Sequence, residues 1–252
     1  MPRTMLSNEQ WKKLSNLMIF TGRVYQKCDH RKAFEGILYR MRTGGPWRDI
    51  PDYFGDWSAI YRRFNLWSKK GILVSVFRAL KNDPDLEWVF IDGTIVKAHQ
   101  HCAGAATDNT QSIGKSVAVN TTKIHMAVDS YGLPIEFTLT GGEVDDSKEA
   151  INLIDLLPSC GYIIADKGYD SETIREQIRD KLSLPVIPRK QNSKVGNTDI
   201  DWCLYKYCHL VDNVFTRLKQ YRGIATRYDK LQVNYESTVA LGCSMIWLSM
   251  SV

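Results

Sequence analysis

The 252-residue chain is predicted to adopt a mixed α/β fold, with a small helical domain over residues 1–85 and a mixed sheet flanked by helices over residues 86–252. Apolar residues recur at helical spacing from Leu6 to about Leu80, without a strand signal. After residue 86, short runs rich in β-forming residues alternate with helical patterns. A hydrophobic content of 44% is enough for a substantial core.

The first region contains three clear helical patterns, centred on residues 11–17, 34–41 and 60–67. Breaks fall at "TGGPWRDIP" (43–51) and "NDPD" (82–85), where Gly and Pro end helices. Ser58 is the expected N-cap of the third helix. The second break is the expected domain boundary.

The third helix combines basic and aromatic residues. This pattern suits a helix that grips DNA phosphates while its aromatic side chains anchor it, although a solvated basic face explains it equally well. Residues 1–90 carry 16 Lys+Arg against 9 Asp+Glu, and residues 91–252 carry 17 against 19, so a polyanionic partner is favoured for the first part. The basic residues are Arg62, Arg63, Lys69 and Lys70, and the aromatic ones are Tyr61, Phe64 and Trp67.

The second region contains four β-rich runs, at residues 87–98, 121–130, 133–141 and 161–166. The two middle runs are joined by Tyr131 and Gly132, which predicts an antiparallel hairpin. Helices are expected at about 145–157, 171–180, 202–222 and 234–250. Two long polar loops, 99–120 and 188–202, are of a length that is usually functional or mobile.

Two acids follow hydrophobic runs of this region. Asp92 comes after "WVFI" and Asp166 after "YIIA", so each is expected at or near the end of a buried strand. A single Asp there is most often a turn former or helix cap. If the two strands are neighbours, however, the carboxylates can share a pair of hard cations of the kind used in phosphodiester chemistry.

Such a site needs a third acid, and Asp212 is the candidate. At about 100° per residue, the apolar residues of its helix form one stripe. Asp212 falls on the opposite side with Tyr205, Cys208 and Lys219, facing either water or a cleft.

The spacing of Tyr205, Cys208, Asp212 and Lys219 resembles the Y-x2-R-x3-E-x6-K signature of insertion-sequence DDE transposases, with Cys in the Arg place and Asp in the Glu place. Further strings typical of the IS-five family appear in the expected order over residues of about 40–230. They are "MRTGGPWRDIP", "DGTIVKAHQH", "TTKIH", "LTGGEVDDS", "ADKGYD" and "GIATRYDK".

This resemblance implies an RNase H-like catalytic domain after a helical DNA-binding domain. It implies DNA end cleavage and strand transfer by a homo-oligomer bound to terminal inverted repeats and target DNA, with Asp92, Asp166 and Asp212 holding Mg²⁺ or Mn²⁺, as two ions. Arg217, Lys219 and Arg222 would contact DNA, and Tyr205 would help to place the strand.

Two departures weaken the match. The Asp212 carboxylate reaches about 1.5 Å less far than that of Glu, whereas metal coordination tolerates only a few tenths of an ångström. Cys208 removes a permanent cation that binds phosphate. The alternative is therefore a sequence-specific DNA-binding protein with a decayed nuclease domain.

Other candidates are ranked lower. His99, His101 and Cys102 are interpreted as a polar loop rather than a zinc site. His125 is interpreted as a core or cleft histidine, and "DD" at 145–146 as caps of the next helix, with service as a metal ligand the less favoured reading. The six cysteines show no C-x-x-C pair and are expected to be reduced, and no apolar run is long enough for a membrane span, so a cytoplasmic, nucleoid-associated bacterial or archaeal protein is expected.

Overall fold

The structure is a computed structural model that describes residues 4–21, 30–81, 83–102, 111–116, 119–191 and 193–250. The chain forms two compact units. The helical unit comprises Met1–Asn82, Lys97–Gln111 and Leu218–Val252, and the sheet unit comprises Asp83–Val96 and Ser112–Arg217. The predicted domain boundary at residue 85 lies close to the first change of unit, but two later stretches return to the helical unit.

The helical unit is built from helices that bury one apolar face each. Phe34, Leu38, Phe64 and Phe77 are among its fully buried residues. Its elements are α1 (Asn8–Phe20), α2 (His30–Thr43), η1 (Trp47–Asp49), η2 (Asp52–Phe54), α3 (Trp57–Lys69), α4 (Ile72–Leu80), η3 (Gln100–Cys102), α9 (Arg222–Ala225), β7 (Thr226–Arg227) and α10 (Gln232–Met250). The predicted helices around residues 11–17, 34–41 and 60–67 are confirmed.

The long helix α10 is apolar on all sides and is almost wholly buried. A helix of this kind needs neighbours all round, and α10 packs against α3, α4 and α9 of the same unit. No described helix is long and apolar enough to cross a membrane.

The N-terminus of α3 differs from expectation in one detail. The helix begins at Trp57, and its N-cap is Asp56, whose carboxylate accepts a hydrogen bond from Ser58 N at 3.2 Å. The prediction of Ser58 as N-cap is wrong, because Asp is an equally good cap and stands two residues earlier.

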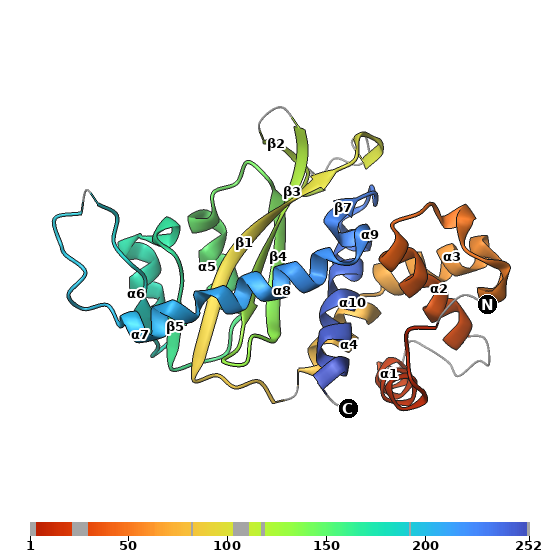
Figure 1. Cartoon of the computed structure of the whole chain (residues 1–252), viewed down its shortest axis with the longest axis horizontal. Coiled ribbons are helices and arrows are strands. Elements are labelled where there is room, and N and C mark those ends of the chain that lie inside the picture. The colour runs from red at the N-terminus through yellow and green to blue at the C-terminus, as the bar shows by residue number, and fades with distance from the viewer. Residues whose placement is uncertain are drawn as a thin grey trace. The chain divides into compact units, whose positions relative to one another are not determined.

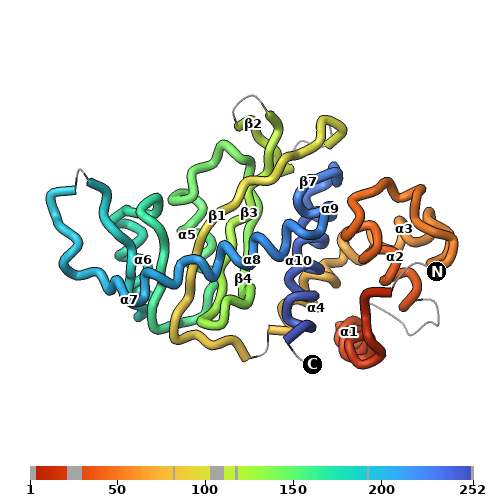
Figure 2. Tube along the Cα trace, viewed as in Figure 1, coloured from red at the N-terminus to blue at the C-terminus, as the bar shows by residue number. Residues whose placement is uncertain are grey.

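The sheet unit is organised around a mixed sheet (Figures 1 and 2). The strand order is β2-β3-β1-β5-β6, and β4 also pairs with β3. β1, β5 and β6 are parallel, whereas β2 and β4 are antiparallel to β3. The strands are β1 (Trp88–Ala98), β2 (Gly114–Ser116), β3 (Val119–Val128), β4 (Pro134–Gly141), β5 (Tyr162–Ile164) and β6 (Leu184–Val186). The predicted mixed α/β fold is confirmed.

The predicted hairpin is β3–β4. Its turn is fixed by Asp129, whose Oδ1 accepts hydrogen bonds from Tyr131 N at 3.0 Å and Leu133 N at 2.8 Å. Gly132 supplies the positive φ of +72° that the turn requires.

Helices flank this sheet. They are α5 (Asp146–Leu156), η4 (Lys167–Tyr169), α6 (Glu172–Asp180), α7 (Trp202–Tyr205), η5 (Lys206–Cys208) and α8 (His209–Lys219). α5 packs against β3, β4 and α6. The helix predicted over residues 202–222 is interrupted by a 3-10 turn at Lys206–Cys208. Within this turn, the Tyr207 ring stacks on Trp88 with 6.0 Å between ring centres.

Candidate active site

The first two acids lie on neighbouring strands, as the proposed site requires. β1 and β5 are parallel, with Phe90 opposite Ile164. Continued for two residues, this register sets Asp92 opposite Asp166. Adjacent strands are about 4.8 Å apart, so the two acids start from closely spaced backbones.

The two acids are positioned differently from each other. Asp166 comes two residues after β5 and caps the short helix η4, where its Oδ1 accepts a hydrogen bond from Gly168 N at 2.6 Å. The prediction that Asp92 also lies at a strand end is wrong, because β1 continues to Ala98. The residue after it, Gly93, also lies within the strand.

Asp212 lies in the first turn of α8 and is exposed. Val211, Val214 and Phe215 of the same helix are buried, so the predicted orientation of Asp212 away from the apolar stripe is confirmed. The Asp212 charge contributes to the raised pKa of Asp92 in β1, so the two carboxylates lie near each other.

Asp92 is the most perturbed acid of this group. Burial, followed by the nearby charges of Asp166, Asp212 and Asp146, raises the pKa of Asp92 to about 6, while a hydrogen bond from Gly93 N opposes the shift. Four carboxylates from separate parts of the sheet unit therefore share one electrostatic environment, the pattern found at many functional sites.

Asp146 is the member of this group that the sequence analysis interpreted as a helix cap, with service as a metal ligand as the less favoured alternative. Its neighbour Asp145 takes the N-cap position of α5, whereas the Asp146 carboxylate turns inward. Asp146 Oδ1 lies 3.2 Å from Lys123 Nζ and 3.5 Å from His125 Nδ1, and it is buried without a hydrogen-bond partner. A Cβ at Gly93 would overlap this oxygen, so any other residue there would require the Asp146 side chain to shift. The reading of Asp146 as a helix cap is wrong.

The neighbours of Asp146 differ in charge. Burial lowers the pKa of His125 to about 4, so this ring is neutral at pH 7, and its Nε2 contacts Thr140 Oγ1 at 2.8 Å. Lys123 is 7% exposed, and its Nζ donates a hydrogen bond to Val144 O at 2.7 Å. Lys123 is therefore the positively charged neighbour of Asp146. His125 is an uncharged, buried side chain beside it, as expected of a core or cleft histidine.

Tyr169 of "ADKGYD" is a second residue that sequence reasoning missed. It is 2% exposed, and its hydroxyl has no hydrogen-bond partner. Burial and the charges of Asp92, Asp146 and Asp166 raise the pKa of Tyr169, so its hydroxyl stays protonated and can donate to a carboxylate. Its place in the same short motif as Asp166 was the available signal.

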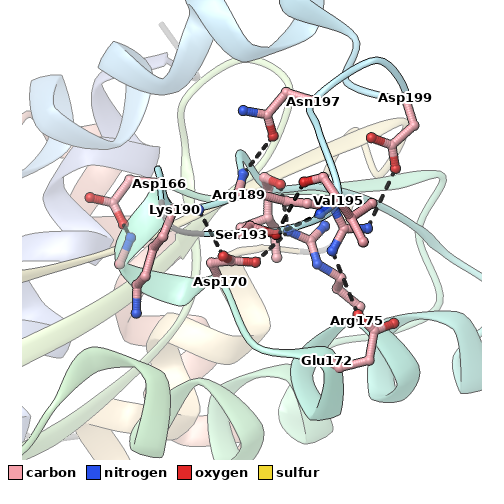
Figure 3. A network of polar contacts seen from close by, with 12 residues as sticks. Asp166, Asp170, Glu172, Arg175, Arg189, Lys190, Ser193, Val195, Asn197 and Asp199 are labelled. Atoms are coloured by element: carbon pink, nitrogen blue, oxygen red, sulfur yellow. Dashed lines mark hydrogen bonds and ion pairs between the residues drawn. The ribbon is translucent and has the colours of Figure 1, made fainter.

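The segment after Asp166 is held by the polar network of Figure 3. Arg175, 1% exposed, donates to Asp170 Oδ1 at 2.8 Å and to Ile187 O at 2.7 Å. Lys190 N donates to the other oxygen of Asp170 at 2.8 Å. The second acid of "DKGYD" thus ties η4 to the start of the loop at 188–202, which fixes the backbone near Asp166.

Two residues predicted to accompany Asp212 join the same environment. Burial and the charges of Asp92, Asp166 and Asp212 raise the pKa of the Cys208 thiol to about 12, so it stays neutral. Burial, with smaller effects of Cys208, Asp166 and Asp92, also raises the pKa of Tyr205. The structure thus brings Tyr205, Cys208 and Asp212 close to the first two acids.

The predicted DNA-contacting cations are distributed over both units. Arg62, Lys69 and Lys70 are exposed on α3, and Arg63 is half-buried there. Arg217 belongs to the sheet unit and is half-buried. Lys219 and Arg222 are exposed residues of the helical unit.

The lower-ranked candidates make other contacts. The His99 and His101 rings are tilted against each other at 4.8 Å between centres, and the Cys102 thiol donates to Arg227 O at 2.9 Å. Across the described stretches, no group of three or more His, Cys, Asp or Glu side chains is placed to hold a metal ion as the side chains stand. The five described cysteines form no disulfide bond, and Cys28 lies outside the described residues.

Comparison with known families decides the assignment. A family model described as "Transposase DDE domain" matches residues 83–247, and one described as "Putative transposase of IS4/5 family" matches residues 6–77. The chain belongs to the insertion-sequence DDE transposases. The family predicted from the Tyr205–Lys219 signature and the ordered strings is therefore confirmed.

Individual relatives agree with this assignment. The transposase is 37% identical over 128 residues to a Brucella ovis protein named "Putative transposase for insertion sequence element IS6501", covering 51% of this chain and 98% of that protein. It is 29% identical over 135 residues to the "Putative transposase for insertion sequence element IS402" of Burkholderia cepacia, covering 49% of this chain and 61% of that protein.

Solved structures are more distant. A piggyBac transposase synaptic complex with hairpin DNA matches with a TM-score of 0.36 and 14% identity, over 81% of this chain and 46% of that chain. A pre-cleavage Mos1 transpososome matches with a TM-score of 0.28 and 11% identity, over 90% of this chain and 80% of that chain. The transposase spans about half the length of the piggyBac protein.

Proposed function

We propose that this transposase cuts DNA at the ends of its own insertion sequence and transfers the freed strands to target DNA, with Asp92, Asp166 and Asp212 as its carboxylate triad. The observation that carries the proposal is that two acids, Asp166 after β5 and Asp212 of α8, both act on the half-buried carboxyl group of Asp92 in β1. Family membership supplies the reaction class.

The triad would hold Mg²⁺ or Mn²⁺, as two ions. Carboxylate oxygens are the ligands that these hard cations prefer. A cation among the acids would also offset the repulsion that helps to raise the pKa of Asp92 to about 6. When bound, such ions supply Lewis-acid stabilisation and an activated oxygen nucleophile for displacement at phosphorus.

The neighbouring residues of the chain have positioning roles in this proposal. Asp146 is paired with Lys123, and Gly93 leaves room for its side chain next to Asp92. Asp146 would thereby help to hold the Asp92 side of the site in place. Tyr169 would donate from its buried hydroxyl to a carboxylate of the triad. These contacts would limit the freedom of the acids before DNA arrives, which lowers the cost of reaching the reactive geometry.

Double-stranded DNA would be held through its phosphates. The exposed cations of α3 together with Arg217, Lys219 and Arg222 are suited to such contacts, and Tyr205 would place the strand near the acids. Two element ends must be handled in one transposition event, so we propose a homo-oligomer on DNA. The protein would work where the DNA of a bacterial or archaeal cell lies, at the nucleoid.

A second candidate function rests on the two departures from the family signature. Cys208 stays neutral and half-buried among the acids, where the signature has a permanent cation, and Asp212 is shorter than Glu. These two residues favour a second function, in which the protein binds the ends of its element but cuts them slowly or not at all. The double substitution Asp212→Glu with Cys208→Arg separates the two functions. If the wild-type protein does not cut DNA and the double variant does, the nuclease site of this protein has decayed. If the wild-type protein is fully active, decay is ruled out.

The test of the first proposal is strand cleavage. The substrate is DNA that carries the inverted repeats flanking the gene, incubated with the purified protein and Mg²⁺. We expect nicking at the repeat ends by the wild-type protein and its loss in Asp92→Ala and Asp166→Ala. Cleavage by both variants at the wild-type rate would remove these acids from the mechanism.

A further inference from the structure

Two of the strings that carried the family resemblance play no part in the carboxylate site, yet the structure brings them together. "MRTGGPWRDIP" (41–51) and "GIATRYDK" (223–230) lie far apart in the sequence, and both line one cavity of about 1050 Å³ within the helical unit. Two glycines allow this approach, since a Cβ at Gly44 would overlap Arg222 and one at Gly223 would press on Met41 O. The volume is at the upper end for a small-molecule site, so it admits a ligand of more than one ring.

The walls of this cavity are aromatic. Trp47 of η1, Trp57 and Tyr61 of α3, and Tyr228 of the loop after β7 line it. Tyr61 is 38% exposed and Tyr228 is 42% exposed, which leaves their rings available to a ligand. Exposed aromatic faces in a basic groove are the platforms on which single-stranded nucleic acid stacks its bases.

Cations stand beside these rings. The Arg48 guanidinium lies 5.5 Å from the Trp57 ring centre, and Lys230 also lines the cavity. Arg40 lies over Trp47 at 4.6 Å and is paired with Asp229 at 3.1 Å, so these two charges cancel. Arg48 and Lys230 therefore leave the cavity with net positive charge, suited to phosphate.

The floor of the cavity carries polar groups without partners. Arg40 and Asn234 are 6% and 5% exposed. Arg40 Nε, a donor, and Asn234 Oδ1, an acceptor, are buried without a hydrogen bond. Both atoms are closed to solvent as the side chains stand, so the aromatic rings and the cations are the groups that a ligand in the cavity can contact.

We propose that this cavity binds a short single-stranded segment of DNA, with bases stacked on its aromatic rings and phosphates held by Arg48 and Lys230. The bases of an intact duplex stack on one another and cannot offer their faces to side chains. The ligand is therefore unpaired DNA, of the kind exposed when an element end is opened. The inference rests on the proposed function for the presence of DNA, but on none of the residues of the carboxylate site.

The test measures binding of a fluorescein-labelled eight-nucleotide oligothymidylate and of a matched blunt duplex to the full chain, without Mg²⁺. We expect Tyr228→Ala and Arg48→Ala each to weaken oligothymidylate binding, the former by about 5- to 150-fold, the loss typical of one stacked base. Duplex binding should change less than twofold. Tyr228→Phe keeps the ring and should bind as the wild type, and so should the control Tyr131→Ala, which removes an aromatic residue that is 71% exposed in the sheet unit.

Photo-cross-linking gives a second readout that does not depend on a variant folding. Oligothymidylate with one 5-iodouracil should cross-link to residues 47–61 or to Tyr228 in the wild-type protein. Cross-links confined to other segments, or unchanged oligothymidylate binding by folded Tyr228→Ala and Arg48→Ala, would overturn the proposal. The proposal would also be overturned if these two substitutions weakened the binding of the duplex and of the oligothymidylate equally. A wild-type protein that neither binds nor nicks element-end duplex but still binds oligothymidylate would instead overturn the proposed transposition function and leave this site standing.

Discussion

Replacing Asp92 by Asn should stabilise the protein when no metal is bound. The side chain lies among the charges of Asp166, Asp212 and Asp146 and is only partly exposed. Its ionised form is disfavoured in the folded state, because burial and these charges raise the pKa of Asp92 to about 6. Asn keeps the shape of the side chain and removes the charge.

The size of the effect follows from linkage. The pKa of Asp92 moves from 3.8 to about 6, and one unit corresponds to about 1.4 kcal/mol, so ionisation of Asp92 costs the folded state at most about 3 kcal/mol. Contact of the carboxylate with water lowers this cost of ionisation. For Asp92→Asn we expect the free energy of unfolding to rise by about 1–3 kcal/mol, or Tm to rise by roughly 2–10 °C. Because the folded-state pKa is raised, the cost is fully present above about pH 6 and disappears as the pH falls below 3.8.

The assay is thermal unfolding in EDTA at about pH 8 and about pH 4. Asp92→Asn should melt higher than the wild type at the first pH and nearly equally at the second. Asp145→Asn is the matched control, because the Asp145 side chain is 73% exposed and should leave Tm unchanged. A Tm for Asp92→Asn at or below the wild-type value at pH 8 would refute the electrostatic account, as would an equal gain at both pH values.

Two further substitutions test other parts of the structure. Gly93→Ala places a methyl group on the Asp146 carboxylate and should lower DNA nicking at least about tenfold, whereas Gly196→Ala, which meets nothing within 4 Å, should not; equal nicking by the two variants would show that Asp146 has no positioning role. Asp229→Asn leaves the buried Arg40 charge unpaired and should lower the free energy of unfolding by about 3 kcal/mol in urea titrations, and a loss below about 0.5 kcal/mol would contradict the importance of this ion pair.

Much of the fold could be predicted because the local signals are strong. The hairpin at Tyr131–Gly132 and the helices α5, α6 and α10 lie close to the positions that periodicity and turn residues predict. The strands β2 and β6 have only three residues each, too few to show a period. Gly93 lies inside β1, where a glycine allows the close approach of the Asp146 side chain.

The site was predictable where its residues follow a linear pattern. Asp92, Asp166 and Asp212 stand out through hydrophobic runs and helical spacing. Tyr169 stands in the same short motif as Asp166, whereas Asp146 joins the site only through the tertiary packing of α5, which local sequence does not reveal. The cavity between residues 41–51 and 223–230 is hidden for the same reason, because its two sides are about 180 residues apart.

The most direct test of the carboxylate site is a change of metal preference at Asp166. In Asp166→Cys, a soft thiolate replaces a hard carboxylate ligand, which weakens binding of Mg²⁺ more than that of Mn²⁺. If Asp166 coordinates the catalytic ion, the variant should fail to nick element-end DNA in Mg²⁺ and regain nicking in Mn²⁺, while Asp166→Ala stays inactive in both. Nicking by Asp166→Cys at the wild-type rate in Mg²⁺, or no recovery in Mn²⁺ by a folded variant, would contradict coordination of the metal by Asp166.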